Sequence, residues 1–540
     1  MTDPVLPTTL AAQWTWWSTL DRAHILIAMA FLLVVALALP ATLRLAWRSL
    51  AALPATERNV ALGFCLLGIA LRLVAPERLV MIFSAYRQAE DVAVAIAVPK
   101  YGAGTFVLHR LAFAVAAADH SLVVDLHRWC AILALPLWLA LLARLQPPPG
   151  AVGHAAWLLA CLPLLVRDAA TESNMLPPLL WLAAGLVQLD HGLTSGRVRY
   201  LWLASCCGGL AAMARPELPI MVPVLVVAWL VLRRPQPVPG WPIVAGPVLI
   251  LAAAIALQVE HLLSAAASDI ATGALPPLGW GAVGDVVAAL SAAAPLQPQL
   301  VPVAVAGFGL WAVLDGVHSR RTARVLLTVA LVWMALPALD LPEPSIPRLH
   351  APAVLLLTLT AALAIAQFSR LWLRIGAVAL CVLTALPTLP QVCADTNEND
   401  ADLFVRRAFA ALPATGACLI YLSAGDLPPP HKTQRAQPLY LLRPPHRDVT
   451  AVDHTTWRRA GHPQCANGTF LLVDHRCWAA HANGRNGSTA TMMGVGCQSL
   501  LSAHRWTAVL EQRAVNHGDN AYGYWGDGPA FALGLYRLNL

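Results

Sequence analysis

The sequence predicts a mostly α fold, a polytopic membrane bundle of about twelve transmembrane helices followed by a small C-terminal α/β domain. Three observations predict it. Hydrophobic residues make up 58% of the 540, only 12% are charged, and apolar runs of spanning length fill most of residues 24–390. Ordinary soluble domains carry about 25% charged residues. The lipid bilayer is therefore the expected solvent for most of this chain.

Residues 1–23 are predicted to be an interfacial segment ahead of the first span. Trp14, Trp16 and Trp17 cluster there, and tryptophan is enriched where a bilayer meets water. The segment also carries acidic residues, so we predict no cleaved signal peptide.

The spans follow from the requirement for about 20 predominantly apolar residues per crossing. The predicted spans are 24–44, 59–76, 126–145, 152–166, 176–190, 200–214, 218–232, 242–259, 300–317, 324–339, 351–367 and 373–390. Prolines inside several of them are expected to bend the helix. These are Pro163, Pro177, Pro219 and Pro337.

The arginines predict the orientation of the bundle, since short cytoplasmic loops concentrate basic residues. The net charge of +7 comes almost wholly from arginine, because Lys100 and Lys432 are the only lysines. Arg44, Arg144 and Arg233 fall on the side that we assign to the cytoplasm. The other side then receives the large outer loop 76–125 and the tail 391–540. The arginines are scattered over the loops, so no basic face for nucleic acid is indicated.

The tail 391–540 alternates short β-like runs with turns. We predict a helix at 402–411 and strands at 417–422, 438–442, 469–473 and 530–536. In an oxidising compartment a disulfide is expected among Cys465, Cys477 and Cys497, with the pairing left open. The competing interpretation is a zinc site, because His462, His475 and His481 lie near these cysteines.

The large outer loop carries the first candidate site. Glu90 or Asp91 could act as a general base for an acceptor hydroxyl, or could help to hold a divalent cation beside a phosphate. The alternative is that both carboxylates form the solvated face of a surface helix. The candidate substrate contacts in the same stretch are Tyr86, Arg87, Lys100 and Tyr101.

A second candidate is Arg215, which is followed directly by Pro216 and Glu217. Ionisable groups close to membrane depth are costly and indicate function. A guanidinium binds phosphate oxygens in a bidentate fork, so Arg215 could hold the phosphate of a lipid-linked donor. The alternative is a structural ion pair of Arg215 with Glu217 or Asp168.

Five short motifs follow one another along residues 59–390. They are Leu71-Arg72-Leu73, Tyr101-Gly102-Ala103-Gly104, Ala143-Arg144-Leu145, the hairpin Leu164–Ser173 with its polar tip, and Gly209-Leu-Ala-Ala-Met-Ala-Arg215-Pro216-Glu217. Their order resembles the GT-C superfamily of membrane glycosyltransferases, which includes protein mannosyltransferases and aminoarabinose transferases. The resemblance implies a lipid-phosphate-linked sugar donor and a tail domain outside the membrane.

One departure from the superfamily concerns the base. The resemblance implies an acidic residue soon after the first span, but Val80–Tyr86 contains no carboxylate and Glu90 and Asp91 come later. Either the acidic pair has shifted along the loop, or the chain has lost or relocated its base. Asp168 and Glu172 are the substitutes to test next. Arg348 and His350 occupy the position of a further lipid-phosphate contact, with interfacial snorkelling as the alternative.

The implied function is transfer of a sugar from a polyprenyl-phosphate donor to a protein, lipid or glycan acceptor on the extracytoplasmic side. A divalent cation, Mg²⁺ or Mn²⁺, is a candidate cofactor, and no other cofactor is expected. The expected location is the bacterial inner membrane, with the C-terminal domain in the periplasm. Two other classes remain open, a non-catalytic scaffold or envelope-assembly factor of the same fold and a lipid or sugar transporter.

Overall fold

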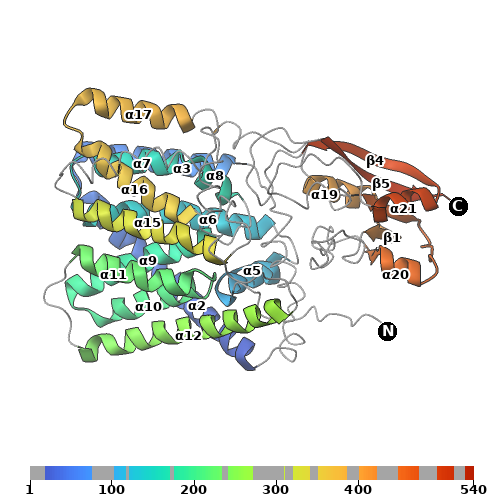
Figure 1. The fold of residues 1–540 in the computed structure, drawn as a ribbon, viewed down its shortest axis with the longest axis horizontal. Coiled ribbons are helices and arrows are strands. Elements are labelled where there is room, and N and C mark those ends of the chain that lie inside the picture. The colour runs from blue at the N-terminus through green and yellow to red at the C-terminus, as the bar shows by residue number, and fades with distance from the viewer. Residues whose placement is uncertain are drawn as a thin grey trace. The chain divides into compact units, whose positions relative to one another are not determined.

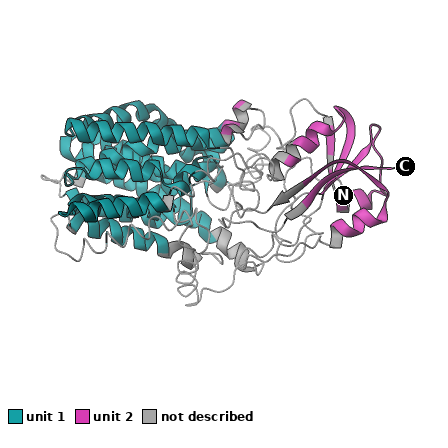
Figure 2. Cartoon of the chain, turned by 90° about the horizontal axis from the view of Figure 1, so that it is seen from above, with its two compact units in different colours: residues 1–77, 94–111, 123–394 teal, residues 78–93, 112–122, 395–540 magenta. Residues whose placement is uncertain are grey.

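The structure is a computed structural model of the chain. It describes residues 19–75, 102–116, 121–170, 175–233, 241–271, 309, 320–340, 351–385, 389, 401–421, 448–473, 495–515 and 530–539. The chain divides into two compact units (Figure 2). The helical unit comprises residues 1–77, 94–111 and 123–394, and the tail unit comprises residues 78–93, 112–122 and 395–540.

The helical unit is a bundle of helices that run side by side (Figure 1). Their bounds are α2 Thr19–Ala51, α3 Ala55–Val74, α5 Ala103–Ala116, α6 Ser121–Arg144, α7 Ala151–Ala160, α8 Pro163–Ala169, α9 Leu176–Ser195, α10 Val198–Ala212, α11 Leu218–Arg233, α12 Trp241–Ala271, α15 Arg320–Asp340, α16 Ala351–Gln367 and α17 Leu371–Ala385. Helix α10 packs against α9, α12 and α2, while α7 packs against α3 and α16.

Eleven of the predicted spans coincide with helices or with the α7–α8 pair, and of the twelfth, 300–317, only Gly309 is described. Within the described residues, three helical segments are long and apolar enough to cross a membrane: Asp21–Ala51, Val124–Arg144 and Pro242–Leu263. The bent pair α7–α8 makes a fourth if it counts as one span. The described residues therefore show a membrane bundle and leave the predicted count of twelve as a prediction.

Burial separates the helices that form the centre of the bundle from those at its surface. Every residue of α16 from Ala351 to Ala366 is buried. By contrast, α2, α12 and α17 expose large aliphatic side chains, among them Leu37 at 74%, Leu249 at 67% and Leu371 at 68%. An apolar outer surface of this kind suits contact with lipid rather than water. The chain is an integral membrane protein.

Two of the four predicted proline bends need correction. Pro163 marks a real break, since α7 and α8 meet at 53°. Pro177 and Pro219 instead lie in the first turns of α9 and α11, where a missing N–H removes no intrahelical hydrogen bond. These two prolines begin their helices and do not bend them.

An ion cluster joins four helices near their carboxyl ends. Asp190 of α9 accepts a hydrogen bond from Arg144 of α6 at 2.6 Å and one from Arg233 of α11 at 2.5 Å. Arg144 also donates to Ser49 Oγ and to the Leu45 carbonyl of α2. The Asp190 side chain is only 3% exposed. Each carboxylate oxygen has a partner, so we read this Asp190 cluster as a structural tie.

The tail unit is a five-stranded mixed sheet with helices on both faces. Its elements are α19 Ala401–Ala411, β1 Thr415–Tyr421, β2 Asp448–Asp453, α20 His454–Arg459, β3 Thr469–Val473, α21 Val495–Ala503, β4 Trp506–Val515 and β5 Ala530–Leu538. The strand order is β2-β1-β3-β5-β4. Strand β1 runs parallel to β2 and β3, and β5 runs antiparallel to β3 and β4.

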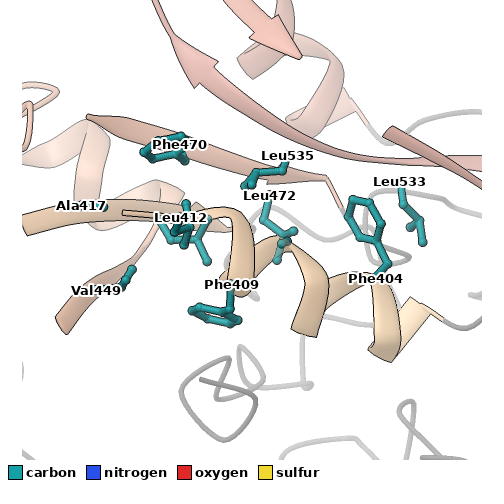
Figure 3. Packing of buried hydrophobic residues seen from close by; sticks show 11 residues of the cluster. Phe404, Phe409, Leu412, Ala417, Val449, Phe470, Leu472, Leu533 and Leu535 are labelled. Atoms are coloured by element: carbon teal, nitrogen blue, oxygen red, sulfur yellow. The ribbon is translucent and has the colours of Figure 1, made fainter. Parts of the chain in front are cut away.

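Alternation along the strands builds two cores, one on each face of the sheet. Leu419 and Phe470 face α19, whose Phe404 and Phe409 are fully buried (Figure 3). The next residues in each strand, Ile420 and Leu471, pack on the other face with Trp457 of α20 and Leu500 of α21. The predicted α/β domain is thus present.

Cys465 pairs with a cysteine outside the predicted group of three. Cys465 bonds to Cys418, with the two Cα atoms 5.6 Å apart, and Cys497 is disulfide-bonded as well. The physical reason is the sheet: β1 and β3 are parallel neighbours, which places Cys418 beside the turn that leads into β3. The disulfide also removes Cys465 as a thiolate for the zinc alternative, while His475 and His481 lie outside the described residues.

Candidate functional site

Three of the twelve predicted site residues lie in the described part of the chain: Asp168, Arg215 and Glu217. The others lie outside the described residues; they are Tyr86, Arg87, Glu90, Asp91, Lys100, Tyr101, Glu172, Arg348 and His350. The predicted convergence of Glu90 or Asp91 with Glu172 and Arg215 therefore stays a prediction.

Arg215 and Glu217 form a buried ion pair in the turn between α10 and α11. Arg215 Nε donates to Glu217 Oε1 at 2.6 Å, and the two residues are only 4% and 9% exposed. The Glu217 carbonyl accepts hydrogen bonds from the first turn of α11, so the pair lies at that helix amino terminus. The partial positive charge of a helix amino terminus favours anions. The turn thus combines a guanidinium with a site for negative charge.

The Gly102–Gly104 segment packs directly on this turn. The Gly104 N–H donates to the Met213 carbonyl at 2.8 Å. Gly102 has a φ of +111°, and a Cβ added there would lie 2.3 Å from the same carbonyl oxygen. A Cβ on Gly104 would lie 2.5 Å from the Leu210 carbonyl oxygen. Only glycine permits so close an approach, so two motifs more than 100 residues apart form one local structure.

Replacing Gly104 by alanine should therefore disturb the turn that holds Arg215. The new methyl group would meet backbone atoms on α10, which cannot swing away like the end of a side chain. We expect the free energy of unfolding to fall by about 1–3 kcal/mol, measured by thermal unfolding in detergent. Gly63→Ala on α3 is the matched control, because no atom lies within 4 Å of its Cβ position. A Gly104→Ala protein as stable as the wild type would contradict this packing.

Arg167 and Asp168 are consecutive charged residues near the end of the short helix α8. All seven residues of α8 are buried, with Arg167 at 5% exposure and Asp168 at 2%. Burying charge in a membrane protein costs several kcal/mol and defaults to a functional interpretation. Glu172, which the sequence places four residues later, lies outside the described residues. Asp168 is thus the one candidate base whose surroundings the structure describes.

Sequence reasoning missed a buried histidine pair. His109 of α5 and His127 of α6 lie with their Nε2 atoms 2.8 Å apart, and neither is exposed. Helix α5 is not one of the candidate spans. Burial and the neighbouring His127 ring hold the pKa of His109 well below its ordinary value. The signal that could have revealed the pair is a histidine inside each of two otherwise apolar helices.

The described residues contain no group of three His, Cys, Asp or Glu side chains that could hold a metal ion. The two carboxylates proposed beside a divalent cation, Glu90 and Asp91, lie outside the described residues. The reaction proposed below is therefore assigned to side chains alone. Of the predicted site residues, the structure describes two arrangements. The Arg215 guanidinium is held by the Glu217 carboxylate in the turn before α11, and the buried Asp168 carboxylate follows Arg167 in the chain.

Comparison with known proteins gives one informative result. No family model matches the chain, and no curated protein matches it. Among solved structures it is similar to ArnT from Cupriavidus metallidurans in the apo state, with a TM-score of 0.51 and 12% identity over 88% of this chain and 97% of that one. ArnT is a GT-C glycosyltransferase. At 12% identity the likeness shows the fold alone, a membrane bundle of helices with a small sheet domain.

Proposed function

We propose that this chain transfers a sugar from a polyprenyl-phosphate donor to an acceptor on the extracytoplasmic side of the membrane. The observation that carries the proposal is the buried Arg215–Glu217 pair at the amino terminus of α11. It suits a phosphate held where the bundle meets the outer compartment. The likeness to ArnT supports the proposal at the level of fold. The inner membrane of a bacterium, with the tail unit in the periplasm, is the corresponding location.

In the proposed reaction Arg215 holds the donor phosphate through its guanidinium N–H groups. Glu217 fixes the orientation of that guanidinium, since it accepts a hydrogen bond from Nε. In the proposed complex the terminal nitrogens of the guanidinium donate to phosphate oxygens. The positive end of α11 adds to the stabilisation. As the bond from the sugar to the phosphate breaks, the electron pair leaves with the phosphate, and these charges stabilise it.

Asp168 is the proposed general base. Its carboxylate takes the proton of the acceptor hydroxyl while that oxygen attacks the anomeric carbon from the side opposite the phosphate. The new glycosidic bond forms as the bond to phosphate breaks, so the configuration at that carbon inverts. The products are a glycosylated acceptor, a lipid phosphate and a protonated Asp168.

The test uses the Arg215–Glu217 pair in the full-length protein in nanodiscs. Polyprenyl-phosphate mannose and polyprenyl-phosphate aminoarabinose serve as donors, with release of polyprenyl phosphate as the readout. Arg215→Gln leaves Glu217 buried without its partner, so the double variant Arg215→Gln/Glu217→Gln is the decisive one. We expect it to fold but to transfer about 10- to 150-fold more slowly, because hydrogen bonds to charged groups contribute about 1.5–3 kcal/mol.

A double variant that is stable and transfers at the wild-type rate would reduce the pair to a structural role. A wild-type protein that binds the donor lipids but turns over neither would instead favour the scaffold. The absence of a carboxylate between Val80 and Tyr86 is the observation that keeps the scaffold as the second candidate.

A further inference from the structure

The α7–α8 break contains a carbonyl that its own helix cannot satisfy. In an uninterrupted helix the Leu159 carbonyl would accept from the N–H of residue 163. Residue 163 is proline, which has no N–H, and the chain bends by 53° between the two helices. A buried carbonyl without a donor is costly. Another group must therefore supply the donor.

Arg72 supplies it from the neighbouring helix α3. Its Nη2 donates to the Leu159 carbonyl at 3.1 Å, and its Nη1 donates to the Ala160 carbonyl at 3.4 Å and to the Gly68 carbonyl at 2.9 Å. The Arg72 residue is only 2% exposed. Its positive charge lies against the negative carboxyl end of α7, which stabilises it. One guanidinium thus replaces the missing N–H across two helices.

Close approach of the two helices makes this contact possible. A Cβ added to Gly68 would lie 3.1 Å from the Cα of Ala160 and 2.9 Å from a methyl carbon of Leu135. Helices α3, α7 and α8 accordingly lie together in the bundle (Figure 1). Glycine one turn before Arg72 therefore brings the guanidinium within reach of the break.

Arg72 also lines a small apolar cavity. Residues that line it with Arg72 include Trp138, Leu165 of α8 and Leu176 at the start of α9. The cavity therefore borders the Arg72 guanidinium together with side chains of α8 and α9.

We propose that Arg72 is a positioning residue: it holds the α7–α8 break open and so directs α8, which carries Arg167 and Asp168. The proposal rests on the proposed function, because Asp168 is the base only if the chain transfers sugar. It assigns a role to the arginine of the Leu71-Arg72-Leu73 motif, which the mechanism above leaves unused. Arg72 touches no reacting atom in this account.

The experiment compares Arg72→Met, Pro163→Ala and the double variant in full-length protein. Arg72→Met removes the donors, and we expect a lower unfolding temperature and about 10- to 100-fold slower transfer, as for a misplaced catalytic group. Pro163→Ala restores an N–H for the Leu159 carbonyl but favours a straight helix. We expect the double variant to regain thermal stability and to remain slow. Arg72→Lys, which keeps the charge and some donors, should recover part of the rate.

Arg58→Met on the same helix is the matched control, since Arg58 makes only a long hydrogen bond of 3.5 Å to Ala51 within the described residues; we expect no change. A double variant that regains both stability and rate would overturn the proposal and leave Arg72 a purely structural role. An electron cryomicroscopy comparison of the α7–α8 bend in the wild type and in Arg72→Met tests the positioning role of Arg72 separately from the proposed sugar transfer. If the wild type transfers nothing but the bend changes in Arg72→Met, the proposed function fails and the positioning geometry stands; an unchanged bend overturns the positioning role.

Discussion

Asp168→Asn should lower the rate constant of sugar transfer by about 100-fold or more, because a positioned general base contributes about 10²–10⁴-fold. Asparagine has nearly the same shape, so α8, whose residues are all buried, should keep its packing. Binding of the lipid donor should change little, since Asp168 acts on the acceptor. The measurement is the single-turnover rate at saturating donor, compared with the donor dissociation constant.

The controls are the other carboxylates that the sequence offers as bases. Glu90→Gln, Asp91→Asn and Glu172→Gln should each retain more activity than Asp168→Asn. Asp168→Glu keeps a carboxylate and should recover part of the rate. If Asp168→Asn transfers at half the wild-type rate or better while one of the other three variants is inactive, the base lies in that residue and the assignment to Asp168 is wrong.

Asp190→Asn should lower the free energy of unfolding by about 3 kcal/mol, the lower end of the range for breaking a buried ion pair. The substitution leaves Arg144 and Arg233 without the carboxylate between them. We place the effect at the lower end because the Arg233 side chain is 24% exposed. Chemical unfolding in detergent micelles measures it.

Asp125→Asn is the matched control for Asp190→Asn. Asp125 also pairs with an arginine, Arg128 at 3.1 Å, but its side chain is 52% exposed, and exposed pairs contribute at most about 1 kcal/mol. A loss of similar size in both variants would mean that burial does not distinguish these pairs, and the structural role of the Asp190 cluster would then fail.

The helices were predictable because a span in lipid must satisfy all its backbone groups internally and cover its outside with apolar side chains. The predicted span 351–367 coincides with α16. However, the sequence could not distinguish a proline that breaks a helix from a proline that begins one. Pro163 breaks its helix whereas Pro177 begins one, and the difference lies in where the preceding helix ends.

In the sheet of the tail unit, too, the sequence predicted only some of the elements. The strands recognised from apolar runs, β1, β3 and β5, are the three central strands, and the two missed strands, β2 and β4, are the edges. An edge strand faces solvent along one side and needs no continuous apolar run. The partner of Cys465 lies outside the predicted group for a related reason, because Cys418 and Cys465 are 47 residues apart in the sequence and only the parallel pairing of β1 with β3 brings them together.

Motif order pointed to Arg215, Glu217 and Asp168, and the ion pair of Arg215 with Glu217, one of the two pairs that the sequence offered as the alternative, is present. The packing around that pair could not be predicted. The fit of Gly104 on the Met213 carbonyl joins segments whose distance in sequence exceeds any local pattern. Arg72 belonged to a recognised motif, yet its role depends on a proline in another helix. Contacts of this kind arise from tertiary packing, which the spacing of residue types does not encode.

Photolabelling tests the central claim most directly, namely that charged side chains from separate turns of the helical unit hold a lipid phosphate. A polyprenyl phosphate with a diazirine next to the phosphate is irradiated with the protein in nanodiscs, and the labelled peptides are identified by mass spectrometry. We predict labels within residues 102–106, 163–175 or 213–221, and loss of those labels in Arg215→Gln/Glu217→Gln. Labels confined to the tail unit, or labelling of the helical unit that the double variant leaves unchanged, would contradict the claim.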